Sequence, residues 1–314
     1  MRKVSIVGAG SVGSTFAFAL AKSGLAEEIV LIDKNHELAL GQALDLAHGL
    51  PFFPAVKIKA GNSSDYSDSS LIVITAGVAQ KPGETRLQLL EKNAAIVQDI
   101  IKEIELQNSK AVIVMVTNPV DIMTYVATKN SKLPKTQIIG SGTVLDSARL
   151  RYFLSSHCSV DVHNVHAYVL GEHGDSEFAA WSMTHVAGMP MSQYCPLCRS
   201  CADWQVERKK IEKQVRDSAY HIIGYKGATY YGISMALVRI SSAILRGEKS
   251  VLTVSTFLNG EYGLKDVCLS VPCIVSNKGV SRIIENKLTD EEIGLLTNSA
   301  NILKKSLSQL RNMK

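Results

Sequence analysis

The sequence contains no long hydrophobic run, no strong excess of one charge and few aromatic residues. Its 314 residues carry a formal net charge of +5 at pH 7, with both signs mixed along the chain. Nucleic-acid-binding proteins usually show a clustered basic stripe, and none is found here. No segment reaches roughly 20 consecutive apolar residues, the length that spans a bilayer, and the first residues do not resemble a signal peptide. We therefore expect a cytoplasmic protein with neither nucleic-acid nor membrane partners.

Cysteine is scarce too, but three of the six cysteines are clustered. Cys195, Cys198 and Cys201 form a C-x-x-C-x-x-C segment. This spacing could hold zinc or begin an iron–sulfur site, although a fourth ligand at ordinary spacing is missing. Cysteines stay reduced in the cytoplasm, so we expect thiols and no disulfide. The sequence favours oxidation-sensitive surface thiols here and no bound metal.

Apolar residues are plentiful, at 46% of the chain, and the length suggests about two domains. In the first 140 residues short apolar runs alternate with longer amphipathic stretches. Unbroken apolar strands that alternate with helices are typical of a parallel sheet covered on both faces. The sequence therefore predicts a Rossmann-type, doubly wound α/β domain over residues 1–142. Its predicted strands and clearest helices are residues 4–7, 28–32, 56–60, 71–75 and 111–116, and residues 11–25 and 86–107.

Residues 143–314 show a different pattern, which predicts an α+β domain that binds the substrate. Turn sequences at 259–260 and 277–279 separate the last apolar runs, as expected for antiparallel strands. A capping sequence at Thr289 opens a final helix. The other predicted elements are helices over residues 204–224 and 228–246, and strands over residues 165–170, 179–185, 251–258, 267–275 and 280–284.

A glycine-rich segment follows the first predicted strand and opens the first predicted helix. Gly8, Gly10 and Gly13 form a G-x-G-x-x-G, and Asp33 ends the next strand. Glycines let the backbone approach a pyrophosphate at a helix N-terminus, and an acidic residue at this spacing accepts hydrogen bonds from a ribose diol. The same carboxylate repels a 2′-phosphate, which favours NAD over NADP. The motif leaves FAD open, and a glycine-rich tight turn without a ligand is the alternative.

A candidate catalytic histidine lies in the second half of the chain. His173 follows a predicted strand between glycines, and histidine suits proton transfer because its unperturbed pKa is ~6.5. Asp146 and Arg149 are three residues apart and share a helix face, whereas Arg151 points to another face. Arg149 can therefore serve one site and Arg151 a second one. The alternative is an ordinary loop histidine and a solvated helical ion pair.

Two further segments follow predicted strands, at the edge where ligands bind in such sheets. Residues 77–86 contain glycines and a proline, which indicates a mobile loop that could carry Arg86 onto a substrate as it closes. Asn118 follows the strand at 111–116, where a neutral donor and acceptor can lie near a nicotinamide. The candidate site therefore draws residues from both predicted domains.

Together these segments resemble the L-lactate and malate dehydrogenase family, and within it the bacterial L-lactate dehydrogenases. The resemblance covers nearly the whole chain. It implies NAD as the cofactor, a homotetramer, and the reversible reduction of pyruvate to L-lactate, the last step of lactate fermentation. It rests on the segments VGAGSVGS, AGVAQKPGETRLQLLEKN, VTNPVDIMTYV, IGSGTVLDSARLRY, NVHAYVLGEHGDSE and KGATYYGI, in this order.

The resemblance also implies a role for each matching residue. His173 would be the acid and base, and Asp146 would orient its imidazole. Arg149 would bind the substrate carboxylate as a bidentate pair, and Arg86 would polarise the carbonyl. The residues that would line the substrate pocket are Gln80, Asn118 and Thr229, and those along the cofactor are Val12, Gly77, Val78, Val116 and Asn118.

Gln80 distinguishes the two activities of this family, because the malate enzymes carry arginine at the matching position. A neutral glutamine fits a methyl group, and burying an unpaired second carboxylate beside it would cost several kcal/mol. The alternatives are a malate or other 2-hydroxyacid dehydrogenase and, from another class, a non-catalytic NAD-binding homologue. Intact His173, Asp146, Arg149 and Arg86 argue against the last of these.

A second, regulatory site is implied by Arg151 and His166. These residues match the positions that bind fructose 1,6-bisphosphate in activated bacterial enzymes. Two subunits related by a symmetry axis would each contribute one such pair, so four cationic side chains would meet the two phosphates of the bisphosphate. Related enzymes without activation carry the same pair, so the resemblance leaves activation by the bisphosphate as an expectation.

Overall fold

A nine-stranded sheet forms the centre of the computed structural model, which describes residues 2–79, 83, 85–198 and 203–311. Six strands are parallel in the order β3-β2-β1-β4-β5-β6. This is the order of a doubly wound dinucleotide-binding sheet, so the predicted fold class is confirmed. The six strands are β1 (Lys3–Val7), β2 (Glu28–Ile32), β3 (Lys57–Ala60), β4 (Leu71–Ile74), β5 (Val112–Met115) and β6 (Ile138–Gly140).

Three antiparallel strands extend the same sheet beyond β6. They are β12 (Ser250–Asn259), β13 (Lys265–Ser276) and β14 (Gly279–Ile283), and β12 meets β6 where Ser255 pairs with Gly140. The antiparallel strands expected in the second half are therefore present. The sheet is continuous across residue 142, and the division into residues 1–142 and 143–314 stays a prediction.

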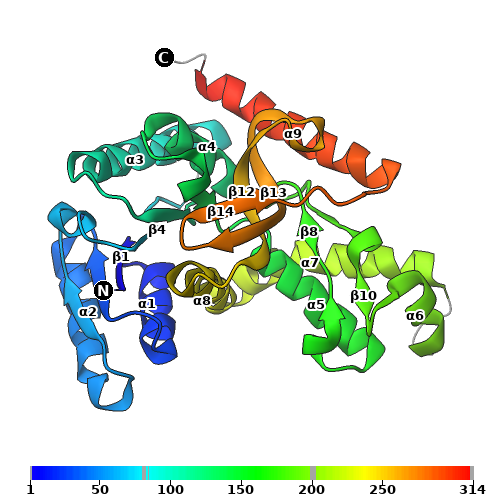
Figure 1. Cartoon of the computed structure of the whole chain (residues 1–314), viewed down its shortest axis with the longest axis horizontal. Coiled ribbons are helices and arrows are strands. Elements are labelled where there is room, and N and C mark those ends of the chain that lie inside the picture. The colour runs from blue at the N-terminus through cyan, green and yellow to red at the C-terminus, as the bar shows by residue number, and fades with distance from the viewer. Residues whose placement is uncertain (1, 80–82, 84, 199–202, 312–314) are drawn as a thin grey trace.

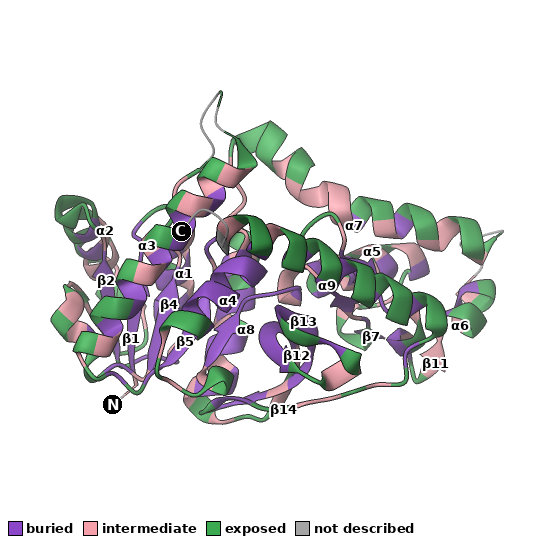
Figure 2. Ribbon diagram, turned by 90° about the horizontal axis from the view of Figure 1, so that it is seen from above, coloured by how far each residue is buried: buried purple, intermediate pink, exposed green. Residues whose placement is uncertain are grey.

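Helices cover both faces of the sheet, and Figure 1 shows α3, α4 and α9 above it and α1 and α8 below it. Buried positions fill the parallel strands except β3, whereas the outer faces of α2, α3 and α9 are exposed (Figure 2). Among the described residues no helix is long and apolar enough to cross a membrane. The helices are α1 (Ser11–Ser23), α2 (His36–His48), α3 (Arg86–Leu106), α4 (Val120–Asn130), α8 (Tyr231–Arg246) and α9 (Asp290–Arg311).

A second, smaller core lies at the end of the molecule away from the parallel strands (Figure 1). It packs α5 (Val144–Cys158), α6 (Met191–Cys198) and α7 (Trp204–Lys226) around buried apolar side chains. Three short strands lie beside them, namely β7 (Val165–His166), β10 (His185–Val186) and β11 (Met189–Pro190). This core includes Leu150, Leu154, Val165, Ile211 and Val215.

Two strands predicted in this region are wrong as single elements. Residues 165–170 form β7 and then β8 (Val169–Leu170), which belong to different sheets. Residues 179–185 are divided among the end of β9 (Phe178–Ala179), a 3-10 helix at Trp181–Met183 and the start of β10. β7 pairs with β10, and β8 pairs with β9. β7 and β10 pair across the segment that holds β8 and β9, so apolar periodicity alone could not place the break.

Candidate active site

One buried carboxylate holds two of the predicted site residues. Asp146 lies in the first turn of α5, and its side chain is 1% exposed. Its Oδ2 lies 2.6 Å from His173 Nδ1, and its Oδ1 accepts a hydrogen bond of 2.7 Å from Arg149 Nη1. The side chains of His173 and Arg149 keep 26% and 12% of their surface exposed. With Nδ1 held by Asp146, the Nε2 atom of His173 is the nitrogen left to meet a substrate.

The electrostatics of this group keep His173 protonated. Burial lowers the pKa of the imidazole, but the charge of Asp146 and its hydrogen bond outweigh burial and raise the pKa to about 9. Burial also acts to raise the pKa of the Asp146 carboxyl, and the nearby charges of His173 and Arg149 hold it below its usual value. His173 and Asp146 therefore form an ion pair at neutral pH, and His173 is ready to donate a proton.

Two buried carboxyl groups beside His173 were missed by the sequence reasoning. Asp121, in the first turn of α4, accepts a hydrogen bond of 2.8 Å from the backbone N–H of His173. Burial raises the pKa of Asp121 to about 6. Glu177 is 6% exposed, and burial followed by the charge of Asp146 raises its pKa to about 9. No local pattern could have found either residue, because each acts through contacts with distant parts of the chain.

Arg86 is the first residue of α3 and stands apart from the group around Asp146. The helix begins with a capping box, in which Thr85 accepts from the N–H of Gln88 and the Gln88 side chain accepts from the N–H of Thr85. Arg86 lines a cavity of about 800 Å³ together with Glu172 and other residues. Among the described residues it forms no hydrogen bond with His173 or its two partners. The structure therefore places Arg86 in the same cavity as Glu172, the chain neighbour of His173, but not in contact with the group around Asp146.

The glycine-rich segment fits a dinucleotide phosphate. Gly8 has φ of +103°, and a Cβ on Gly13 would lie 1.9 Å from the carbonyl oxygen of Gly8, so neither position tolerates a side chain. Gly10 caps α1 without a side-chain hydrogen bond, and a Cβ there would meet open space. The N-terminus of α1 therefore has room beside Gly10, as phosphate binding at a helix N-terminus requires.

Asp33 follows β2 beside this segment. Its Oδ2 accepts a hydrogen bond of 2.7 Å from the N–H of Ala9, and its Oδ1 accepts one of 2.9 Å from the N–H of Asn35. Each carboxylate oxygen has further lone pairs, so both can still accept hydrogen bonds from a ribose. The residues present thus fit NAD at the carboxyl ends of β1 and β2.

One asparagine joins the two loops predicted to follow the cofactor. The Asn93 side chain on α3 accepts from the N–H of Val78 at 2.9 Å and donates to the carbonyl oxygen of Asn118 at 3.0 Å. Asn93 is buried, Val78 is partly buried and Asn118 is exposed. The loops after β4 and β5 are therefore fixed together at one edge of the sheet. Of the other predicted cofactor residues, Val12 in α1 and Val116 after β5 are partly buried, and Gly77 after β4 is exposed.

The remaining predicted residues lie in several places. Gln80 is outside the described residues. Thr229 is partly buried in the connection between α7 and α8. Arg151 and His166 line one cavity of about 460 Å³, so the structure brings the two predicted effector residues together.

The cysteine cluster differs from the sequence expectation. Cys195 is buried and disulfide-bonded, so the prediction that every cysteine is a thiol is wrong at this position. Cys198 is partly buried, and its Sγ donates a hydrogen bond of 3.1 Å to the carbonyl oxygen of Cys195, while Cys201 lies outside the described residues. The prediction of thiols rested only on the reducing conditions of the cytoplasm. Such conditions do not tell which sulfur atoms folding brings together.

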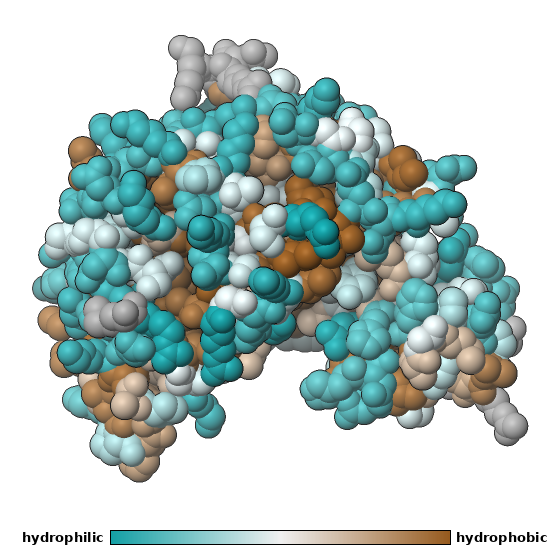
Figure 3. Space-filling view, viewed as in Figure 1, coloured by the Kyte–Doolittle hydropathy of each residue, from teal (hydrophilic) through white to brown (hydrophobic). Residues whose placement is uncertain are grey.

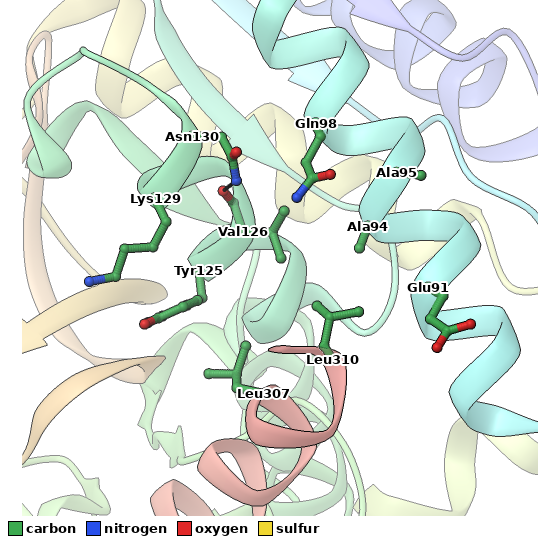
Figure 4. A pocket seen from close by; sticks show the side chains of 10 residues that line it. All are labelled: Glu91, Ala94, Ala95, Gln98, Tyr125, Val126, Lys129, Asn130, Leu307 and Leu310. Carbon is green, nitrogen blue, oxygen red and sulfur yellow. Dashed lines mark hydrogen bonds between the residues drawn. The ribbon is translucent and has the colours of Figure 1, made fainter. Parts of the chain in front are cut away.

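A third cavity, of about 590 Å³, lies between α3, α4 and the end of α9 (Figure 4). Its lining is mainly apolar, with Glu91, Gln98 and Lys129 among the polar side chains. Lys129 is paired with Asp266 at 2.7 Å. None of the described residues that line this cavity belongs to the predicted site.

Family models match almost the entire chain. The lactate/malate dehydrogenase NAD-binding domain matches residues 2–140, and the alpha/beta C-terminal domain of the same family matches residues 143–313. The L-lactate dehydrogenase of Treponema denticola is 54% identical over 311 residues, which cover 98% of each chain. That of Acetivibrio thermocellus is 52% identical, over 99% of this chain and 98% of its own.

Solved structures agree with these sequence matches. A lactate dehydrogenase from a Medee basin deep-sea metagenome library superposes with a TM-score of 0.96 at 45% identity, covering 99% of this chain and all of its own. The minor L-lactate dehydrogenase of Enterococcus mundtii, in a ligand-bound form, gives a TM-score of 0.94 at 42% identity. That match covers 100% of this chain and 98% of the other.

Proposed function

The chain belongs to the lactate/malate dehydrogenase family and is an NAD-dependent oxidoreductase, and from this premise we propose that it interconverts pyruvate and L-lactate. The observation that carries the proposal is the group in which Asp146 holds His173 at 2.6 Å and Arg149 at 2.7 Å. It combines a protonated imidazole with a guanidinium, which are the donor of a proton and the partner of a carboxylate. A small 2-oxo acid needs both.

The proposed chemistry assigns one task to each side chain. NADH supplies the hydride for the carbonyl carbon of pyruvate. Protonated His173 donates its Nε2 proton to the carbonyl oxygen, and Asp146 stabilises the imidazolium and fixes the ring. Arg149 pairs with the substrate carboxylate, and Arg86 moves in from the start of α3 to meet negative charge that develops on the oxygen. In the reverse direction neutral His173 takes the proton from lactate.

Malate is the competing substrate within the family. The proposal for lactate rests on Gln80, whose neutral side chain offers no partner for the second carboxylate of oxaloacetate. The relatives from Treponema denticola and Acetivibrio thermocellus are both L-lactate dehydrogenases. Purified protein is expected to oxidise NADH rapidly with pyruvate and poorly with oxaloacetate. Faster turnover of oxaloacetate would favour the malate enzyme, and no turnover of either acid would favour a non-catalytic homologue.

The substitution Gln80→Arg tests the residue that we propose as discriminator. An arginine at this position can pair with a second carboxylate, so the ratio of kcat/KM for oxaloacetate over pyruvate is expected to rise at least about 100-fold, the effect of about 3 kcal/mol. Steady-state kinetics on both acids measure the ratio. Gln214→Arg, a change of the same chemistry at an exposed position of α7, is the matched control. An unchanged ratio in Gln80→Arg would remove Gln80 from this role.

The proposal extends to regulation by fructose 1,6-bisphosphate. Arg151 and His166 line one cavity, together with Arg239. The Nε atom of Arg151 is buried and has no hydrogen-bond partner among the described residues. Buried donors without a partner are uncommon, and a bound phosphate would satisfy this one. The bisphosphate is thus the effector that this cavity would take.

A homotetramer in the cytoplasm completes the proposal, at the last step of lactate fermentation. Leu38, Leu40 and Leu44 on α2 are exposed, as are Tyr231 and Met235 on α8. Figure 3 shows hydrophobic side chains gathered at the lower left, over α2. Exposed apolar surface of this kind often marks contacts between subunits. Sedimentation of the purified protein with and without the bisphosphate tests the assembly.

A further inference from the structure

Three side chains with metal-binding atoms meet at the end of the molecule that holds α5, α6 and α7 (Figure 1). His157 lies in the last turn of α5, and Cys195 and Cys198 lie three residues apart on α6. The Nε2 atom of His157 is 3.5 Å from the Sγ atom of Cys195. All three donor atoms lie within 4.8 Å of one another. This cluster, called here the His157 cluster, is separate from the residues assigned to catalysis.

The surroundings of His157 orient its ring toward the sulfur atoms. Glu207, in the first turn of α7, places its Oε1 3.8 Å from the Nδ1 atom of His157. The same carboxylate also accepts a hydrogen bond from Lys210. Metal-binding histidines commonly present one ring nitrogen to the metal and the other to a carboxylate. The Nε2 atom therefore faces the cysteines while Nδ1 faces Glu207.

The distances suit a tetrahedral ion. Zinc binds sulfur at about 2.3 Å and imidazole nitrogen at about 2.0–2.1 Å, so tetrahedral angles separate two such ligands by about 3.5 Å. This separation is the one found between His157 and Cys195. Cys195 is fully buried and only 10% of the His157 side chain is exposed, which limits competition from solvent. Thiolate and imidazole together select zinc over magnesium or calcium.

We infer that the reduced protein binds one Zn²⁺ through His157 Nε2, Cys195 Sγ and Cys198 Sγ, with water in the fourth position. The ion joins the end of α5 to α6, and α5 carries Asp146 and Arg149 in its first turns. The spacing of the cysteines pointed to Cys195 and Cys198 but gave no sign of His157. His157 precedes Cys195 by 38 residues, and only the packing of α5 against α6 brings them together.

The sulfur atom of Cys195 can be bonded either to another sulfur atom in the disulfide or to zinc, so the two states exclude each other. A trialkylphosphine with water reduces the disulfide by two electrons, and the phosphine takes the oxygen atom of water to become the phosphine oxide. The two sulfur atoms take up the two protons of that water. Zinc then displaces the thiol protons of Cys195 and Cys198, so binding releases two protons to solvent.

Metal titration of the full-length reduced protein tests the inference. The protein is treated with the phosphine, freed of reagent and metal without oxygen, and titrated with Zn²⁺ and separately with Co²⁺. One ion per chain is expected, together with the sulfur-to-cobalt charge-transfer band and intense visible bands of a tetrahedral cobalt thiolate. Binding of Zn²⁺ is also expected to raise the Tm of the protein.

Variants assign the ion to its ligands. His157→Ala and Cys198→Ser are expected to weaken zinc binding at least about 100-fold, and Glu207→Gln about 10- to 100-fold. Two controls should bind as the parent does. Cys273→Ser removes a free buried thiol on β13, and His163→Ala removes an imidazole whose side chain is 86% exposed.

Three results would overturn the inference. The first is less than one ion per chain in the reduced parent protein. The second is a cobalt spectrum without the sulfur band, since Asp146, His173 and Glu177 form another cluster of donors and contain no sulfur. The third is unchanged binding in His157→Ala and Cys198→Ser. None of these results bears on the turnover of pyruvate, so the inference and the proposed function fail independently.

Discussion

At the scale of single residues, Asp146 links the two side chains on which the proposed chemistry depends. Its carboxylate lies against both His173 and Arg149 and is almost fully buried. A buried carboxylate is stable only when it is paired, and here both oxygens are paired. One residue therefore sets the pKa of the proposed acid and the position of the substrate anchor.

Asp146→Asn is expected to move the pH dependence of pyruvate reduction. The reaction needs protonated His173, so its rate falls as the pH rises through the pKa of His173, which is about 9 in the structure. Without the Asp146 charge this pKa falls toward the ordinary value of about 6.5. At pH 8 the protonated fraction then drops about 30-fold. Rate profiles of kcat/KM from pH 5 to 10 measure the shift, and an unmoved alkaline limb would contradict the role given to Asp146.

Arg149→Lys is expected to raise KM for pyruvate more than it lowers kcat. Lysine keeps the charge but cannot form the paired hydrogen bonds of a guanidinium with a carboxylate. Loss of one charge-assisted hydrogen bond, about 1.5–3 kcal/mol, corresponds to a rise of about 10- to 150-fold. Arg246→Lys, an exposed arginine at the end of α8, is the control. Equal KM values for parent and variant would assign the substrate carboxylate to another residue.

At the scale of elements, the turns between strands and helices place the site. β1 leads through Gly8 into α1, and β6 leads through Gly142 into α5. Gly142 has φ of +53°, and a Cβ there would lie 2.5 Å from the N atom of Ser255 on β12. This close approach lets the first turn of α5 start beside the sheet. Asp146 is consequently brought under the loop that carries His173.

Substitutions in the glycine-rich turn should separate folding from cofactor binding. Gly13→Ala places a Cβ against the Gly8 carbonyl oxygen, so the free energy of unfolding is expected to fall by about 1–3 kcal/mol. Gly10→Ala meets open space and should fold normally, but its Cβ occupies room reserved for the pyrophosphate. Its Kd for NADH is expected to rise at least about tenfold.

Thermal unfolding and fluorescence titration with NADH measure the two effects. Gly41→Ala is the control, because its Cβ would also meet open space on exposed α2. A Gly10→Ala protein that binds NADH like the parent would show that the pyrophosphate lies elsewhere.

At the scale of the whole molecule, the sheet unites two functions. Its parallel strands end at the proposed cofactor site, and its antiparallel strands support the segments that carry His173 and Asp146. Gly171, two residues before His173, bridges to Ser270 on β13. The opposite side of α5 faces the cavity of Arg151 and His166. A ligand in that cavity would therefore contact the helix that carries Asp146 and Arg149.

Arg151→Gln is expected to remove activation by fructose 1,6-bisphosphate. In the parent protein the bisphosphate should lower the pyruvate concentration at half-saturation, because phosphate bound at Arg151 stabilises one arrangement of α5. In the variant the saturation curves with and without bisphosphate should coincide. Arg282→Gln, on β14, is the matched control. Activation that survives in Arg151→Gln, or is absent from the parent protein, would remove the proposed effector site.

Local sequence was enough to predict most strands of the parallel sheet and the cofactor motif, because both depend on near neighbours. Apolar runs predicted the parallel strands other than β6, and the strand–glycine–helix order predicted the turn at Gly8. The spacing of Asp146 and Arg149 placed them on one face of a helix. Each of these features is fixed by backbone geometry within a few residues.

Which of these residues meet depends on packing between segments that are distant in the sequence. The contacts of His173 with Asp146 and Asp121 join positions 27 and 52 residues apart, and chain spacing carries no information about such pairs. The same reason explains the division of residues 165–170 between two sheets and the separation of Arg86 from His173. It also explains how His157 comes to lie beside Cys195, because this contact follows from the packing of α5 against α6.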